Sequence, residues 1–332
     1  MTRIAVLGAG SWGTTLADLL AKKGHAVRIW AYEPEVVAAI NSSHENPGFL
    51  PDAPLAPSLV AGGDAARAVS EAELVLFAVP SHAAANVLTL VREALRPGVP
   101  LVSATKGIEP RDLILMSQLA GRLLPETPFA ALSGPSFARE VYEGQPTAVV
   151  AAATEPATAQ LVQSVFSTRR FRVYSNQDVI GVELAGALKN VIAIAAGMLE
   201  GIGLGHNPRA ALITRGLAEI ARLGRAMGAD PLTFAGLAGM GDLILTTTGS
   251  LSRNRALGVA LAQGQSLTEY QAAHRSVAEG AGTSRAAAAL AQRMQVEMPI
   301  TANVCAILFE GKPPRESVSD LMERDLKAEQ WQ

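Results

Sequence analysis

The sequence predicts an α/β fold in which a parallel sheet with helices on both faces is followed by an all-α C-terminal domain. Short, fully apolar segments alternate with helix-like segments in the first half of the chain. This alternation is typical of a buried parallel sheet. From residue 178 the chain is rich in Ala, Leu, Gly and Arg, with helical spacing and few strand signals. We therefore expect two domains, residues 1–177 and 178–332.

Strands are predicted in the first domain where apolar or β-branched runs end at glycine, proline or polar residues. The predicted strands cover residues 4–7, 26–30, 74–79, 100–105, 129–133 and 147–152. Helices are predicted there over 12–23 and 112–124 from the spacing of apolar residues. The second domain shows only helical patterns, over 178–200, 208–227, 255–263, 283–295 and 300–309.

Composition places the chain among ordinary globular proteins. Hydrophobic residues make up 49% and charged residues 17% of its 332 residues, and the net charge is −2. This charge provides no basic field for nucleic acid or for an anionic membrane. The most apolar window, 191–199, is too short to span a bilayer, and no targeting segment precedes the first strand. We expect a soluble cytoplasmic protein with no nucleic-acid partner and no membrane insertion.

Three further features narrow the kinds of site and reaction that the chain can support. Cys305 is the single cysteine, which excludes an internal disulfide and fits a reducing compartment. The five histidines are scattered without ligand spacing, so no metal site is expected. No G-x-S-x-G segment is present, which leaves acyl transfer by a serine nucleophile without support.

A glycine-rich loop follows the first predicted strand and opens the first predicted helix. Its glycines are Gly8, Gly10 and Gly13, in the spacing G-x-G-x-x-G. In this context the first glycine permits a tight turn, the second lets backbone amides approach a pyrophosphate, and the third allows helix–strand packing. Free N–H groups at the helix start then face the anion. The loop predicts a Rossmann-type domain that binds a dinucleotide, and the alternative is a glycine turn without a ligand.

The end of the second predicted strand bears on the choice of dinucleotide. Glu33 lies about twenty residues after the glycine loop, where an acidic residue commonly bonds the ribose 2′-hydroxyl and favours NAD. Pro34 follows it and is able to turn it outward, and Arg28 is close in sequence. The preference for NADH or NADPH therefore stays open.

Lys189 lies in a predicted helix among small and apolar residues. Its neighbours on the helix face are Ala185, Gly186, Ile192 and Ala193, none of them a carboxylate. Such an ammonium either reaches out to water or works in a pocket. We expect the small neighbours to leave room for a ligand.

Three other polar clusters are candidates for the same site, and each has a plainer alternative. Lys106 follows a predicted strand at the edge where open α/β sheets bind ligands, although it could be a solvated loop lysine. Asp242 could simply be a helix N-cap. Arg253 and Asn254 together suit a phosphate group, because guanidinium binds phosphate oxygens in pairs, but they could be only a charged helix start.

Combined, these residues predict hydride transfer to a ketone. That reaction needs a proton donor at the carbonyl oxygen, and its reverse needs the same group as a base. A lysine serves if burial or a second cation lowers its pKa towards neutrality. Lys106 would be that cation for Lys189, and Asp242 would orient Lys189 and partly offset the charge.

Ordered blocks over nearly the whole chain resemble those of one family, the NAD(P)-dependent sn-glycerol-3-phosphate dehydrogenases of bacterial type. The blocks are GAGSWGT (8–14), AVPSH (78–82), ATKGIE (104–109), SGPSFAREV (133–141), PTAVV (146–150), ELAGALKNVIAIAAGMLEGIGLGHNPRAALITRGLAEI (183–220), GLAGMGDLILT (236–246), SRNRALG (252–258), VAEGAGT (277–283) and MPI (298–300). The lysine-bearing block is the most specific of them.

The resemblance implies a Rossmann domain and a helical domain that act on dihydroxyacetone phosphate and sn-glycerol 3-phosphate. By position, Lys189 looks like the catalytic proton donor and acceptor, with Lys106 on substrate and cofactor and Asp242 in support. Further positions imply contact with the substrate: Gly134, Ser136, Asn190, Thr246, Ser252, Arg253 and Asn254. Others imply contact with NADPH or NADH: Gly8, Gly10, Ser11, Trp12, Gly13, Tyr32, Glu33, Lys106, Ala138, Arg253, Val277 and Glu279.

Tyr32 departs from the family pattern, because many relatives carry histidine or arginine there to meet a 2′-phosphate. The resemblance also implies a homodimer and a role in supplying glycerophospholipid synthesis. Two alternatives remain. One is a related dehydrogenase acting on a carboxylate substrate, such as a β-hydroxy acid or ketopantoate. The other is a nucleotide-sensing protein without catalysis.

Overall fold

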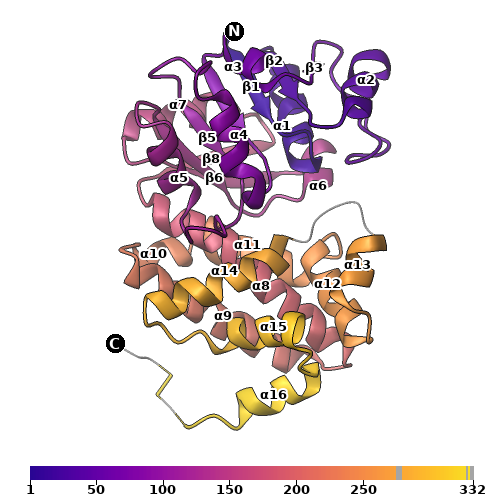
Figure 1. The fold of residues 1–332 in the computed structure, drawn as a ribbon, viewed down its shortest axis with the longest axis vertical. Coiled ribbons are helices and arrows are strands. Elements are labelled where there is room, and N and C mark those ends of the chain that lie inside the picture. The colour runs from indigo at the N-terminus through magenta and orange to yellow at the C-terminus, as the bar shows by residue number, and fades with distance from the viewer. Residues whose placement is uncertain (274–278, 327, 330–332) are drawn as a thin grey trace.

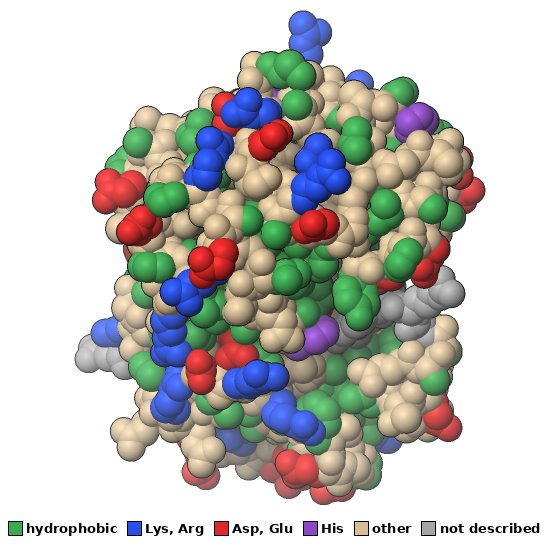
Figure 2. Space-filling view, turned by 45° about the horizontal axis from the view of Figure 1, so that its top comes forward, with side chains coloured by type: hydrophobic (Ala, Val, Ile, Leu, Met, Phe, Trp, Pro, Cys, Tyr) green, Lys and Arg blue, Asp and Glu red, His purple; other side chains and the backbone are tan. Residues whose placement is uncertain are grey.

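The computed structural model describes residues 1–273, 279–326 and 328–329. A sheet flanked by helices forms one half of the molecule, and a bundle of helices forms the other (Figure 1). The N-terminus lies at the outer end of the sheet half. On the face shown in Figure 2, Lys and Arg side chains are interspersed with Asp and Glu, in keeping with the small net charge.

The sheet has eight strands in the order β3-β2-β1-β4-β5-β6-β7-β8. Their bounds are β1 (Arg3–Leu7), β2 (Ala26–Trp30), β3 (Val60–Gly62), β4 (Leu74–Phe77), β5 (Leu101–Ser103), β6 (Phe129–Ser133), β7 (Thr147–Ala152) and β8 (Phe171–Asn176). The predicted strands are confirmed, although those at 74–79 and 100–105 end earlier, at Phe77 and Ser103. The sheet is parallel, as predicted, except that β6 and β7 pair antiparallel. The connection between them, residues 134–146, carries a loop and one small helix.

Helices cover both faces of this sheet, as predicted. They are α1 (Ser11–Lys22), α2 (Pro34–Ser43), α3 (Ala65–Val69), η1 (Ser81–Ala83), α4 (Ala84–Val91), α5 (Met116–Leu123), α6 (Ala138–Tyr142) and α7 (Pro156–Phe166). Alternate residues of β1 serve the two faces: Ile4 and Val6 pack with α1, α2 and α7, whereas Ala5 and Leu7 pack with α3, α4 and α5.

The predicted helix over 112–124 begins later, at Met116. Leu113 has a positive φ of 56°, a conformation that a helix does not contain. The carboxylate of Glu109 accepts hydrogen bonds from the backbone N–H groups of Arg111 and Asp112 at 3.0 and 2.7 Å. These bonds hold the segment ahead of α5 as a turn.

The second half contains only helices among the residues that the structure describes after Asn176. They are α8 (Val179–Gly201), α9 (His206–Ala226), α10 (Pro231–Phe234), η2 (Leu237–Gly241), α11 (Asp242–Thr248), α12 (Arg253–Ala262), α13 (Leu267–Ala273), α14 (Glu279–Arg293), α15 (Pro299–Glu310) and α16 (Pro314–Met322). The five predicted helices are confirmed within a few residues at each end. The division into domains at residue 177 stays a prediction, since α8 shares one hydrophobic core with Ala131 of β6 and Val150 of β7.

Helix α8 is the central element of this half, and it packs against α9, α11, α12 and α14. Glycines let α12 approach it closely. A Cβ atom on Gly197 would lie 1.9 Å from the carbonyl oxygen of Arg255, and one on Gly258 would lie 2.0 Å from that of Ile194. The two backbones are therefore in direct contact, which only glycine permits.

Helix α8 is much longer than the apolar window 191–199, whose shortness was our reason for excluding a membrane span. The helix has 23 residues, and it is long and apolar enough to cross a membrane by those criteria alone. However, 89% of its most apolar window is buried inside the structure. Its apolar surface is explained by its position in the core.

Candidate active site

The glycine loop connects β1 to α1 and is crowded on one side only. Gly8 has a φ of 108°, and a Cβ atom there would lie 2.6 Å from the carbonyl oxygen of Ala78. A Cβ atom on Gly13 would lie 2.0 Å from the carbonyl oxygen of Gly8, so both positions require glycine. Around Gly10, by contrast, no atom lies within 4 Å of the corresponding point. The loop is therefore packed against the sheet and open at Gly10.

The first turn of α1 begins at this open side. Gly10 occupies the N-cap position, and no side chain caps the helix. The first backbone N–H groups of α1 are thus available to an anion, which the helix start favours electrostatically. The loop and this helix start together fit the pyrophosphate of a dinucleotide.

Two predicted cofactor residues follow β2. Tyr32 is 82% exposed, and Glu33 is half-buried at the N-cap position of α2, ahead of Pro34. The carboxylate of Glu33 makes no capping bond to its own helix. Arg28 points elsewhere, since it donates to the carbonyl oxygen of Arg67 at 3.5 Å.

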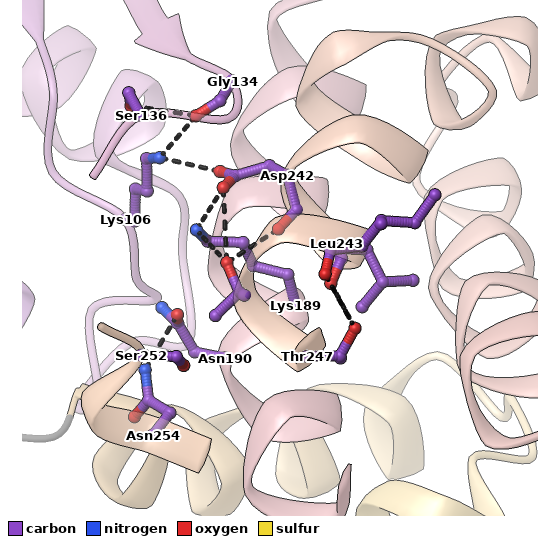
Figure 3. A network of polar contacts seen from close by, with 12 residues as sticks. Lys106, Gly134, Ser136, Lys189, Asn190, Asp242, Leu243, Thr247, Ser252 and Asn254 are labelled. Carbon is purple, nitrogen blue, oxygen red and sulfur yellow. Dashed lines mark hydrogen bonds and ion pairs between the residues drawn. The ribbon is translucent and has the colours of Figure 1, made fainter. Parts of the chain in front are cut away.

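Asp242 joins two lysines at the centre of the site (Figure 3). The Nζ atom of Lys189 on α8 lies 2.5 Å from Oδ1, and that of Lys106 lies 2.7 Å from Oδ2. Asp242 is fully buried at the start of α11, and its carboxylate does not cap a helix. The plainer interpretation of Asp242 as an N-cap is wrong, because the N-cap residue is Gly241.

Lys189 is held in the protein and does not reach out to water. Its side chain is 9% exposed, and it also donates to the hydroxyl of Thr246 at 2.8 Å. That hydroxyl donates in turn to the backbone oxygen of Asp242 at 2.7 Å. Burial lowers the pKa of Lys189 to about 8, while Asp242 raises it and Lys106 lowers it further. The amine can therefore exchange a proton near neutral pH.

At Gly186, one of the small residues beside Lys189, protein atoms fill the room that we expected for a ligand. A Cβ atom on Gly186 would lie 2.8 Å from the hydroxyl of Ser133 and 3.6 Å from Cγ of Lys106. The glycine thus makes room for the Lys106 stem and for Ser133. Ser133, buried at the end of β6, is absent from our sequence-based site, although its place directly before Gly134 could have indicated it.

The loop after β6 contacts Lys106. The carbonyl oxygen of Gly134 accepts hydrogen bonds from Nζ of Lys106 at 3.1 Å and from the hydroxyl of Ser136 at 3.0 Å. Gly134 has a φ of 138°, and a Cβ atom there would lie 2.9 Å from Cα of Val149. Lys106 is therefore no free loop lysine, since it is fixed between this carbonyl and Asp242.

The start of α12 carries a second polar group. Ser252 caps the helix by accepting from the backbone N–H of Arg255 at 3.3 Å, so this cluster does form the start of a helix. Asn254 is buried, and its amide donates to the side-chain oxygen of Asn190 at 2.9 Å. Its oxygen accepts from the backbone N–H of Gly280 at 3.0 Å. Three helices thus meet at Asn254.

Arg253 has a different partner from Asn254. Its guanidinium donates to the hydroxyl of Ser11 in the cofactor loop at 2.7 Å, which links the helical half to the glycine loop. Glu279 is half-buried at the start of α14. Burial raises its pKa to about 7, although Lys106, Lys189 and Arg253 act in the opposite direction. The charges of these three cations therefore influence the ionisation of Glu279 directly.

The remaining predicted cofactor residues have varied positions. The indole ring of Trp12 packs against Phe171, with 6.4 Å between ring centroids, and the residue lies in the first turn of α1. Ala138 begins α6, and its carbonyl oxygen accepts from the hydroxyl of Thr15 at 3.3 Å. Val277 lies outside the described residues.

Comparison with known proteins identifies the family to which this chain belongs. The family model for the NAD-dependent glycerol-3-phosphate dehydrogenase N-terminus matches residues 3–159, and the model for the C-terminus matches residues 178–319. The chain belongs to the NAD-dependent glycerol-3-phosphate dehydrogenase family. A family member from Geobacter metallireducens, named glycerol-3-phosphate dehydrogenase [NAD(P)+], is 55% identical over 330 residues, which cover 98% of each chain.

Solved structures agree with this assignment. The glycerol-3-phosphate dehydrogenase of Coxiella burnetii superposes with a TM-score of 0.94 and 41% identity, covering 97% of this chain and 99% of that one. A ketopantoate reductase from Ralstonia eutropha has a TM-score of 0.62 and 19% identity, covering 96% and 99%. The second likeness shows only the shared fold. The prediction of a Rossmann-type half followed by a helical half is confirmed for this chain, which shares that fold with the Coxiella burnetii structure.

Proposed function

We propose that this protein reversibly reduces dihydroxyacetone phosphate to sn-glycerol 3-phosphate by hydride transfer from NADPH or NADH. The observation that carries the proposal is the buried Lys189 amine, with a pKa of about 8 and hydrogen bonds to Asp242 and Thr246. Membership of the glycerol-3-phosphate dehydrogenase family supports the substrate and the cofactor.

Lys189 is the proton donor in this proposal. The bound nicotinamide supplies the hydride. As the ketone oxygen gains negative charge, the Lys189 ammonium donates a proton to it, and in the reverse reaction the neutral amine accepts the proton. Asp242 keeps the Lys189 amine in position, because its other oxygen is fixed by Lys106. In this proposal Lys106 contacts both substrate and cofactor. Its positive charge stabilises the developing oxyanion.

The phosphate end of the substrate requires cations and amide donors. We assign this role to Arg253 and Asn254, with Asn190, Ser252 and Thr246 in support, and we place Gly134 and Ser136 along the substrate loop. Asn190 and Asn254 fit because their amides are held against each other at 2.9 Å by a bond that uses only one of their four amide hydrogens. Arg253 serves both ligands in this proposal, since it contacts the cofactor loop through Ser11.

The cofactor lies, in this proposal, along the glycine loop. The positions assigned to it are Gly8, Gly10, Ser11, Trp12, Gly13, Tyr32, Glu33, Lys106, Ala138, Arg253, Val277 and Glu279. Tyr32 carries no charge for a 2′-phosphate, and Glu33 favours a ribose hydroxyl, so both cofactors have to be compared. A cytoplasmic location, a homodimer and a role in glycerophospholipid synthesis complete the proposal on the strength of family resemblance.

An assay of the purified protein tests this function. Dihydroxyacetone phosphate is supplied with NADH or NADPH, and oxidation of the cofactor is followed by absorbance. Oxidation that depends on the phosphorylated ketone is the expected result, and the ratio of kcat/KM for the two cofactors gives the preference. No oxidation with either cofactor would end the proposal. A carboxylate substrate such as ketopantoate that outcompetes dihydroxyacetone phosphate would favour the alternative dehydrogenase.

A further inference from the structure

The segment 44–50, between α2 and β3, forms a tight turn against the glycine loop. His44 has a φ of 54°, and the backbone N–H of Leu50 donates to the carbonyl oxygen of Asn46 at 2.7 Å. Asn46 faces inward from this turn, and none of its surface is exposed. A fully buried amide is costly unless its donors find acceptors, so its partners matter.

Both N–H bonds of the Asn46 side chain are used on the glycine loop. The Nδ2 atom donates to the carbonyl oxygen of Ala9 at 2.8 Å and to the hydroxyl of Thr14 at 2.8 Å. The Thr14 hydroxyl donates to the same Ala9 oxygen at 3.1 Å. The Ala9 carbonyl can only accept, which fixes the orientation of the amide. The Asn46 oxygen has no hydrogen-bond partner within the described part of the chain, so the contacts of this side chain are made through its nitrogen.

Holding the Ala9 oxygen also aims the next N–H group. The carbonyl of Ala9 and the N–H of Gly10 belong to one peptide unit, and in a planar trans peptide they point in opposite directions. No cis peptide occurs in the described chain. With its oxygen drawn toward the buried Asn46 amide, the Ala9–Gly10 peptide turns the Gly10 N–H away from the 44–50 turn.

The same turn makes a second hydrogen bond to the glycine loop. The hydroxyl of Ser11 donates to the carbonyl oxygen of Phe49 at 2.5 Å. Because a hydroxyl has one hydrogen, Ser11 can only accept from Arg253, and its side chain has no proton left for a phosphate oxygen. Ser11 therefore faces the anion with its backbone N–H.

We propose that Asn46 is a positioning residue that aims the Gly10 N–H at the cofactor pyrophosphate. It acts through Ala9 and Thr14 and touches neither substrate nor cofactor itself. This inference rests on the proposed function only in taking NADPH or NADH as the ligand. Loss of the Asn46 amide frees the Ala9 peptide to rotate, so the loss falls on cofactor affinity and leaves proton transfer at Lys189 intact.

The test compares Asn46→Ala with Asn41→Ala. Asn41 also uses its amide on the backbone of this region, donating to the carbonyl oxygen of Ala61 at 3.0 Å and accepting from its N–H at 2.9 Å, but it does not contact the glycine loop. Fluorescence titration with NADPH and NADH gives the dissociation constants, and steady-state kinetics at saturating cofactor gives kcat and the KM for dihydroxyacetone phosphate.

We expect Asn46→Ala to raise both dissociation constants about tenfold, with kcat and the ketone KM changed less than about threefold. Asn41→Ala should leave all four constants within about twofold of the unmodified protein. Cofactor affinity that Asn46→Ala leaves unchanged, or that Asn41→Ala weakens as much, would overturn the inference. A wild-type protein that binds the cofactor but does not oxidise it with dihydroxyacetone phosphate would instead refute the proposed function.

Asn46→Asp supplies an independent readout and serves if the alanine variant does not fold. The carboxylate has the same shape but presents an oxygen to the Ala9 carbonyl, so cofactor affinity should fall by about tenfold or more at pH 8. Protonation restores a donor, so the ratio of the variant's affinity to the wild-type affinity should rise as the pH is lowered to 6. A ratio that does not change with pH would contradict the proposed role of the donor.

Discussion

Lys189 is a charge kept inside the protein by two specific contacts. Desolvation of an ammonium is costly, and a single carboxylate offsets it only with good geometry and additional hydrogen bonds. Asp242 at 2.5 Å and the Thr246 hydroxyl at 2.8 Å provide both. Burial lowers the pKa of Lys189 below the ordinary lysine value, because Asp242 offsets the desolvation only in part and Lys106 adds a second positive charge.

Replacement of this amine should affect chemistry more than binding. Lys189→Ala is expected to lower kcat by roughly 10²–10⁴-fold, because it removes proton transfer and electrostatic stabilisation. The dissociation constant for NADPH should stay within about twofold. Lys312→Ala is the matched control, since Lys312 is bonded to Asn303 and Asp320 away from the site. Turnover of Lys189→Ala comparable to that of the control would refute the assignment.

The pKa of Lys189 also sets the direction of the pH dependence. Burial lowers this pKa to about 8, so the amine carries its proton below that pH and loses it above. Reduction uses the protonated form and should slow as the pH rises through about 8. Oxidation of glycerol 3-phosphate uses the neutral form and should become faster over the same range. Measurements of kcat in both directions between pH 6.5 and 9.5 check this, and parallel profiles would contradict it.

Helix starts in this protein are stabilised by carboxylates from distant elements. Glu219 of α9 is buried and accepts from the backbone N–H groups of Ile300 and Thr301, at 2.6 and 3.2 Å, at the start of α15. Glu183 of α8 accepts from the backbone N–H of Ser117 at 2.9 Å and from its hydroxyl at the start of α5. Such bonds satisfy amide groups that a helix start leaves without partners.

Glu219→Ala should therefore destabilise the helical half. The N–H groups of Ile300 and Thr301 would lose their acceptor inside the protein, which costs about 1–3 kcal/mol. Chemical denaturation followed by circular dichroism measures the change in free energy of unfolding. Glu316→Ala, at the exposed start of α16, serves as the control and should change stability by less than about 0.5 kcal/mol. Equal effects of the two substitutions would show that the buried contact does not matter.

These elements also show what the sequence can and cannot predict. Buried strands such as β4 are apolar throughout and were predicted. The edge strand β8 was missed, although its alternation of buried and exposed residues is typical of a half-buried strand. Lys189 was found from its local pattern, but Asp242 lies 53 residues away, so their contact could only be inferred from chemistry. Asn46 carries no local signal at all, because its function depends on a loop 37 residues earlier.

At the scale of the whole molecule, a few polar contacts connect the sheet half to the helical half. Arg253 of α12 donates to Ser11 at 2.7 Å. Arg293 of α14 donates to the backbone oxygens of Asp112 and Leu113, at 2.9 and 2.7 Å, and so holds the turn that contains the positive φ of Leu113. The candidate site also spans the two halves, since Lys106 from the sheet half and Lys189 from the helical half both bind Asp242.

Arg253→Ala should weaken the binding of both the substrate and the cofactor while leaving the fold intact. Loss of a charged hydrogen bond costs about 1.5–3 kcal/mol, so the KM for dihydroxyacetone phosphate should rise about 10- to 100-fold. A smaller rise in the dissociation constant of NADPH is expected, because Ser11 loses its partner on the helical half. Arg225→Ala, an exposed change near the end of α9, is the control. An unchanged KM for the ketone would show that Arg253 does not hold the phosphate.

The position of Lys189 midway along α8 has a consequence for inactivation by heat. Apart from its last turn, the helix is enclosed almost everywhere by other helices and by the sheet, so the amine cannot leave its place while the surrounding core remains assembled. Loss of turnover on warming and loss of the cooperative fold should therefore be a single event at one temperature.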